Sequence, residues 1–135
     1  RKQRELIFLL LFENIFTGYS LDELKEIKFL TEEFSPEDFN DFIEKYFIEI
    51  QEKIPAIDEL ITKFSLKWGK ERLSKVALAI LRLAVYEMLY QDEIPTSVAI
   101  NEAVELSKKY GADKESSFIN GMLGGLSRDL EQKNE

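Results

Sequence analysis

The stretch from Arg72 to Gln91 constrains the fold more than any other, because it is apolar on nearly every side of a helix and contains no Gly or Pro. Its apolar residues follow i, i+3, i+4, i+7 spacing: Leu73, Val76, Ala77, Ile80, Leu81, Ala84, Val85, Met88 and Leu89. A helix of this kind must be wrapped by other helices. For its two charges, Arg82 and Glu87, we expect a structural salt bridge or a charged end that reaches the edge of the core, rather than catalysis. The stretch predicts a buried central helix.

Composition limits the class of protein. A chain of 135 residues indicates one domain, and 44% hydrophobic with 33% charged residues is typical of a folded globular protein. No apolar run approaches the ~18 residues of a membrane span, so we expect none. The absence of histidine removes the commonest general base and metal ligand. The absence of cysteine removes thiolate chemistry and is compatible with a reducing cytoplasm, the location that we expect.

The negative charge is regional. Between Ser20 and Glu59 there are 13 acidic and 4 basic residues, a net of −9, whereas the rest of the chain has 13 acidic and 14 basic residues, a net of +1. The overall charge of −8 therefore leaves room for a basic surface that meets phosphate.

The remaining segments also have helical spacing, and none has the alternation of a strand. We expect about seven helices: Lys2 to Phe16, one starting at Ser20 or Asp22, one starting at Ser35-Pro36 and reaching Ile50, one from Pro55 to Trp68-Gly69-Lys70, the central helix, one from Thr96 or Ser97 to Tyr110, and Phe118 to Leu130. The predicted fold class is all-α, a single domain over 1–135 with helical subdomains of about 1–66 and 67–135.

Several local signals give sharper expectations. Gly18 and Gly111 are expected C-caps, and Pro55 is expected to break or restart a helix. Thr96 or Ser97 is expected to cap the helix that follows, whose buried face we assign to Val98, Ala99, Ala103, Leu106 and Tyr110. Gly121, Gly124 and Gly125 in one helix suggest the close approach of another helix or of a ligand.

Motifs of catalysis are missing from the sequence. The glycines at 121–125 lack the strand and the Lys-Ser/Thr of a P-loop. Glu102 and Glu105 have the i, i+3 spacing of carboxylate metal sites, but no Glu-x-x-His accompanies them. We therefore expect no enzyme activity, no metal and no cofactor, and we expect a binding function.

The second half of the chain resembles the NusB family of bacterial transcription antitermination factors. The blocks that carry the resemblance are Trp68, Arg72-Leu73, Val76, AILRLAVYEML from Ala79 to Leu89, IPTSVAINEAVELSKKYGA from Ile94 to Ala112 and FINGML from Phe118 to Leu123. The first helix matches more loosely, through an arginine-rich start, RKQRE, followed by LIFLLLFE.

The resemblance implies a NusB-like fold of two packed helical subdomains. It implies a role in antitermination on ribosomal RNA operons, in which the protein pairs with NusE, a ribosomal small-subunit protein, on single-stranded boxA RNA within a complex on RNA polymerase. No catalysis and no membrane are implied, and both a monomer and a homodimer remain open.

The resemblance also implies the RNA-contacting residues, which we predict to be Arg1, Lys2, Arg4, Lys108, Lys109, Phe118 and Asn120. The lysines and arginines would contact phosphate, and Phe118 would stack on a base. Each has a structural alternative: a basic terminus for solubility, lysines that suit a helix C-terminus, a core phenylalanine, and an asparagine that caps or bridges helices. We interpret Asn101 and Glu102 as structural polar residues.

The chain departs from the family pattern at Gln3, Phe12, Ser117 and Gly124, where the family often has a basic residue, tyrosine, lysine and aspartate. These departures and the acidic middle motivate one alternative, a protein-interaction adaptor with little RNA affinity of its own. A second alternative is an RNA-binding domain detached from an RNA cytosine methyltransferase, because NusB-like domains also precede such enzymes.

Overall fold

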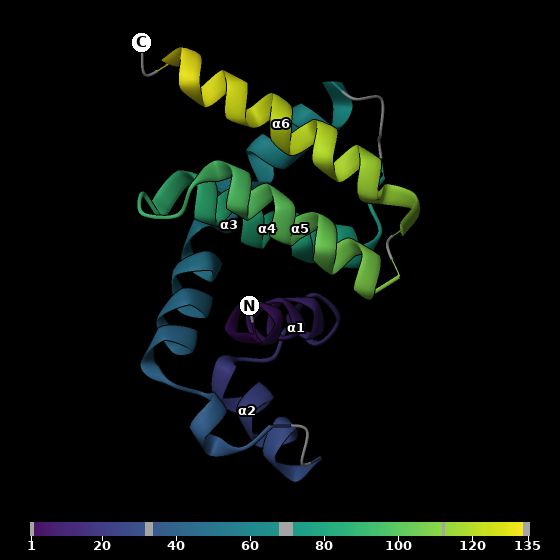
Figure 1. Ribbon diagram of the computed structural model, residues 1–135. Helices are drawn as coiled ribbons and strands as arrows, with labels where there is room; N and C mark the ends of the chain where they lie inside the picture. Colours follow the sequence, from purple (N-terminus) through teal and green to yellow (C-terminus); the bar gives the residue numbers. More distant parts are fainter. Residues whose placement is uncertain (1, 32–33, 68–71, 112, 134–135) are drawn as a thin grey trace. The chain divides into compact units, whose positions relative to one another are not determined.

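The computed structural model describes residues 2–31, 34–67, 72–111 and 113–133, and these residues form helices joined by turns and loops, with no strand among them (Figure 1). The elements are α1 (Lys2–Thr17), α2 (Leu21–Leu30), the 3₁₀ turn η1 (Pro36–Asp38), α3 (Asp41–Lys67), α4 (Lys75–Tyr90), α5 (Thr96–Lys109), the 3₁₀ turn η2 (Asp113–Glu115) and α6 (Ser116–Lys133). The all-α prediction is confirmed, with six α-helices in the described ranges rather than about seven.

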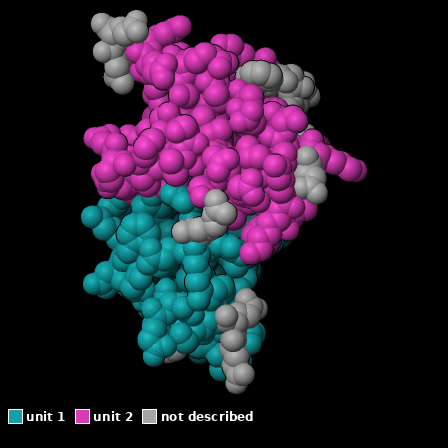
Figure 2. All heavy atoms as spheres, in the orientation of Figure 1, with its two compact units in different colours: residues 1–52 teal, residues 53–135 magenta. Residues whose placement is uncertain are grey.

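The chain forms two compact units, residues 1–52 and 53–135 (Figure 2). The division therefore falls inside α3. The boundary that the sequence predicts, at 66–67, lies instead at the end of α3. The assignment of two subdomains with that boundary stays a prediction. The expected helix end at Trp68-Gly69-Lys70 lies outside the described residues.

Helix ends in the first unit follow the local signals. Gly18 has a φ of 68° and its N–H donates to the Asn14 carbonyl at 2.8 Å, which ends α1 as expected. Ser20 begins α2 with a reciprocal capping box, in which the Ser20 hydroxyl accepts from the Glu23 N–H and the Glu23 carboxylate accepts from the Ser20 N–H.

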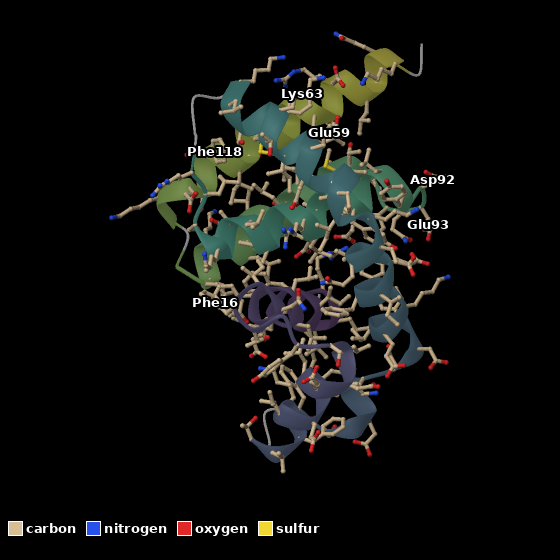
Figure 3. The ribbon with its side chains drawn as sticks, turned by 180° about the vertical axis from the view of Figure 1, so that it is seen from behind. Phe16, Glu59, Lys63, Asp92, Glu93 and Phe118 are labelled. Carbon is tan, nitrogen blue, oxygen red and sulfur yellow. The ribbon has the colours of Figure 1, made fainter. Side chains whose placement is uncertain are left out.

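Ion pairs between helices accompany the apolar core of the first unit. Lys28 of α2 is buried and pairs with Glu13 of α1, and Lys25 pairs with Glu44 of α3. The buried apolar residues of α1 are Leu6, Ile7, Phe8, Leu10 and Leu11. Phe16, near the end of α1, is 59% exposed and packs edge-on against Phe12 (Figure 3).

The helix expected from Ser35-Pro36 begins later than predicted. The Ser35 N–H donates to the Asp38 carboxylate at 2.9 Å, which closes only the 3₁₀ turn η1. α3 then starts at Asp41, where the Asn40 carbonyl oxygen of the side chain accepts from the Ile43 N–H at 3.0 Å. The N-cap of this helix is therefore Asn40 and not Ser35, where the sequence predicted the helix to start.

Pro55 does not break the chain into two helices: α3, which is 27 residues long, continues through it. A proline inside a helix removes one hydrogen bond and costs about 3 kcal/mol. The apolar stripe is in phase on both sides, because Ile50 and Ile57 are two turns apart and both are fully buried. Burial of each such side chain contributes about 1.5–3 kcal/mol, which offsets the cost. This continuity accounts for the helix that is missing from the predicted seven.

The second unit is built around α4, as predicted. Its buried residues are Ala77, Ala79, Ile80, Leu81, Leu83, Ala84, Val85, Tyr86 and Glu87. α4, α5 and α6 pack on one another. The helix starts at Lys75, later than expected, because the Ser74 hydroxyl accepts from the Ala77 N–H at 3.0 Å and caps it.

The expected structural salt bridge of Arg82 is confirmed. Its Nε and Nη2 donate to Oδ1 and Oδ2 of Asp58 at 2.9 and 2.8 Å, which links α4 to α3. This fork-to-fork geometry is the strong form of an arginine–carboxylate pair.

The start of α5 differs from the prediction. Pro95 occupies the N-cap and no side-chain cap is present, so neither Thr96 nor Ser97 caps the helix. Val98, assigned to the buried face, is 42% exposed, whereas Ala99, Ala103 and Leu106 are buried as expected. Tyr110 is half-buried and forms the C-cap, and Gly111 follows with a φ of 91°. None of the described helices is long and apolar enough to cross a membrane.

Candidate functional site

The basic start of α1 lies in the first unit. Lys2 is exposed, and its Nζ is 3.9 Å from Oδ1 of Asp38 in η1. Arg4, two residues along, is half-buried. A cavity of about 110 Å³ adjoins this start and is lined by Lys2, Gln3, Leu6, Phe34, Glu37, Asp38 and Asn40. An exposed pair at this distance contributes little free energy, so Lys2 can exchange Asp38 for a phosphate at small cost. Arg1 lies outside the described residues.

A larger groove runs between α5 and α6 in the second unit. Its volume is about 590 Å³, and its lining residues are Ser97, Ile100, Asn101, Val104, Lys108, Ser116, Ser117 and Asn120. The five residues from α5 have helical spacing and therefore share one stripe of that helix. The groove brings together two of the predicted RNA-contacting residues, Lys108 and Asn120. Its lining combines an apolar floor from Ile100 and Val104 with hydroxyl, amide and ammonium groups.

Two other predicted residues do not line this groove. Lys109 is exposed and its Nζ lies 5.7 Å from the ring centroid of Tyr110. Phe118 is half-buried in the first turn of α6 (Figure 3). Both belong to the same end of the α5–α6 pair as Lys108.

Hydrogen bonds fix the turn that leads into α6. Glu115 of η2 is 7% exposed, and its Oε1 accepts from the Ser74 hydroxyl at 2.5 Å. Ser74 is also the N-cap of α4, so one serine connects the cap to the turn. The hydroxyls of Ser107 and Ser116 are 2.9 Å apart, which ties the end of α5 to the start of α6. The backbone that carries Ser117, Phe118 and Asn120 is therefore held in place.

The close approach expected at the glycines of α6 is not found at Gly124. A Cβ built there meets Nη1 of Arg128 at 3.5 Å, which is an ordinary contact with a flexible side chain. Tight helix packing therefore does not explain this glycine. No group of three or more acidic side chains in the described part of the chain is arranged to hold a metal ion.

Most residues of the groove were not predicted from the sequence as functional. Asn101, interpreted as structural, is exposed and lines it, together with Ser97, Ser116 and Ser117. A signal was present in the sequence, since Ser97, Asn101 and Lys108 share one stripe of the helix. The other residues of that stripe are the apolar Ile100 and Val104. The partner side of the groove comes from α6, and local spacing carries no information about it.

The chain matches the model of the NusB family over residues 1–128. It is 42% identical over 132 residues to the transcription antitermination protein NusB of Natranaerobius thermophilus, covering 96% of this chain and 95% of that protein. It is 39% identical over 139 residues to the protein of the same name from Clostridium botulinum, covering 93% and 97%.

Solved structures are similar over nearly the whole chain. NusB of T. maritima is 34% identical, with a TM-score of 0.78 over 94% of this chain and 89% of that one. A chain from a crystal structure of the antitermination factors NusB and NusE in complex with dsRNA is 26% identical, with a TM-score of 0.77 and 94% of both chains covered.

Proposed function

This chain belongs to the NusB family, and on that premise we propose that it is an antitermination factor that binds single-stranded boxA RNA of ribosomal RNA operons together with NusE. The observation that carries the proposal is the likeness to the protein solved with NusE and dsRNA, which extends over 94% of this chain. The pair would join the antitermination complex on RNA polymerase. We propose that the protein is cytoplasmic, because bacterial transcripts are synthesised in the cytoplasm. The role is binding, without a catalytic step.

The described cationic groups support an RNA interface with two parts. One part is the start of α1 with Lys2 and Arg4, to which Arg1 belongs in sequence. The other is the α5–α6 end with Lys108, Lys109, Phe118 and Asn120. Lys108 is 60% exposed and its Nζ is 3.9 Å from Oε1 of Glu105, an exposed pair that a phosphate replaces at little cost. Phosphate contacts give affinity, and base contacts give selectivity.

One observation favours the alternative of an adaptor with little RNA affinity. Lys2 faces Asp38 and Lys108 faces Glu105, so these two of the three described ammonium groups of the interface already have an anionic neighbour. RNA binding by the NusE complex that is no better than binding by NusE alone would support that alternative.

The test is RNA binding by this protein with and without its cognate NusE. Three RNA probes are compared across salt: boxA RNA, a scrambled strand and a duplex of the same length. Binding of boxA RNA by NusE alone is the control. We expect selective boxA binding that needs both proteins, with log K falling by about 0.7 per log unit of salt for each neutralised phosphate.

Two variants locate the interface. Lys2→Gln and Lys108→Gln should each reduce the salt slope by about 0.7. Lys63→Gln is the matched control, because Lys63 is exposed on α3 and lines neither of the two cavities (Figure 3). Absence of a complex with NusE together with absence of RNA binding would refute the proposed function. Binding that ignores sequence would reduce it to a general basic surface.

A further inference from the structure

Hydrogen bonds join α5 and α6 at both ends of the helix pair that forms the groove. Ser107 near the end of α5 pairs with Ser116 at the start of α6 at 2.9 Å. At the other end, the Ser127 hydroxyl donates to Thr96 Oγ1, the first residue of α5, at 3.3 Å. The two helices are therefore antiparallel, with residue numbers that sum to about 223 at each level (Figure 1).

This register orders the polar groups along the groove. The residue numbers of Asn101 and Asn120 also sum to nearly this value, so the two residues lie at about the same level on opposite sides of the groove. Lys108 lies at the level of Ser116 and Ser117. Asn101 and Lys108 are seven residues apart on one helix, which is about 10 Å along its axis. The groove thus presents two facing amides at one level and an ammonium with two hydroxyls at another.

Each of these groups has capacity for a ligand. Asn101 and Asn120 are both exposed, and each side-chain amide has donor and acceptor atoms side by side. Ile100 and Val104 give an apolar floor between the helices. A volume of about 590 Å³ lies within the size range of small-molecule sites.

We propose that this groove binds one nucleotide of a single-stranded RNA, with the base edge read by Asn101 and Asn120 and the phosphate bound by Lys108. This inference rests on the proposed function, and it adds a specificity-determining residue, Asn101. A nucleobase fits the amide pair because its edge has adjacent donors and acceptors, as in the pairing of asparagine with adenine in DNA. The rise of about 10 Å between positions 101 and 108 along α5 is comparable to the reach of one nucleotide from its base edge to its phosphate.

The first experiment tests the groove without RNA. The whole protein, labelled with ¹⁵N, is titrated with each of the four ribonucleoside 5′-monophosphates, and the side-chain amide signals of Asn101 and Asn120 are followed. We expect saturable shifts of both signals, larger for one base than for the others, and weakened by Lys108→Gln. Inorganic phosphate alone should leave the two amide signals in place. Absence of saturable shifts at both asparagines with all four nucleotides would overturn the inference.

The second experiment uses the complex with NusE and a set of boxA RNAs that differ at single positions. Asn101→Ala should reduce discrimination at one position by about tenfold while other positions are unaffected. Lys108→Gln should instead weaken binding to every RNA in the set. Val98→Ala is the matched control, because Val98 is exposed on the same helix and does not line the groove.

The two failures can be distinguished. If the wild-type complex selects boxA RNA and both Asn101→Ala and Asn120→Ala keep its full discrimination, the groove inference is wrong and the proposed function stands. If the wild-type complex binds no RNA, the proposed function is wrong, and the groove inference falls with it as an RNA site. Circular dichroism of each variant checks that the helices are intact.

Discussion

The ion pair between Asp58 of α3 and Arg82 of α4 should be asymmetric in its effect on stability. The Arg82 side chain is 14% exposed, whereas the Asp58 side chain is 36% exposed. Removing the carboxylate leaves a guanidinium largely buried without its anion, which is costly. Removing the guanidinium leaves a carboxylate that water can reach. The cost therefore depends on which partner is replaced.

The exposures set the magnitudes. Breaking a fully buried pair costs about 3–5 kcal/mol, and the partial exposure of Asp58 lowers this to about 2–4 kcal/mol for Asp58→Ala. Arg82→Met retains an apolar stem in the core and strands only a hydrated carboxylate, so we expect about 1 kcal/mol. The double variant carries neither charge and should be about 1–3 kcal/mol more stable than Asp58→Ala alone.

Urea unfolding followed by far-UV circular dichroism measures all three variants, and the double-mutant cycle isolates the coupling between the two side chains. Glu59→Ala is the control, because it removes the next acid on α3, which is exposed, and should change stability by no more than about 0.5 kcal/mol (Figure 3). The reasoning is refuted if Arg82→Met costs as much as Asp58→Ala, or if the two single effects simply add.

Three further changes test local features of the helices by the same unfolding assay. Pro55→Ala should stabilise the protein by about 1–3 kcal/mol, because it restores a hydrogen bond inside α3; a loss of stability would contradict this. Gly124→Ala should stabilise it by about 0.5–1 kcal/mol, since the new methyl group meets only Arg128 at 3.5 Å, and destabilisation would indicate tight packing there. Ser74→Ala should cost about 1–2 kcal/mol through loss of the α4 cap and of the hydrogen bond to Glu115; an unchanged stability would show that neither bond contributes.

The predicted RNA-contacting residues were reached through a family resemblance, and the structure adds the arrangement of those that it describes. Lys108 and Asn120 line one groove, whereas Phe118 and Lys109 lie outside it. Asn101 became a candidate only through the structure, because its spacing on α5 is compatible with any exposed polar residue. Its role as a candidate depends on Asn120, which is on another helix and 19 positions away in sequence.

Local sequence was sufficient where the physical cause is local. The burial of α4 follows from apolar residues on nearly all sides, and the ends of α1 and α2 follow from Gly18 and from Ser20 with Glu23. These features depend on backbone conformation and hydrogen bonds within a few residues.

Tertiary structure decided features whose causes are distant in the chain. α3 continues through Pro55 because the stripe on both sides is buried, and a local rule for proline does not include that burial. The partner of Arg82 is 24 residues away, and Ser74 and Glu115 are 41 residues apart. The groove lies between α5 and α6, which pack on each other and are joined by hydrogen bonds between residues 9 and 31 positions apart. Periodicity shows which face of a helix is buried, but only packing determines which other face it meets.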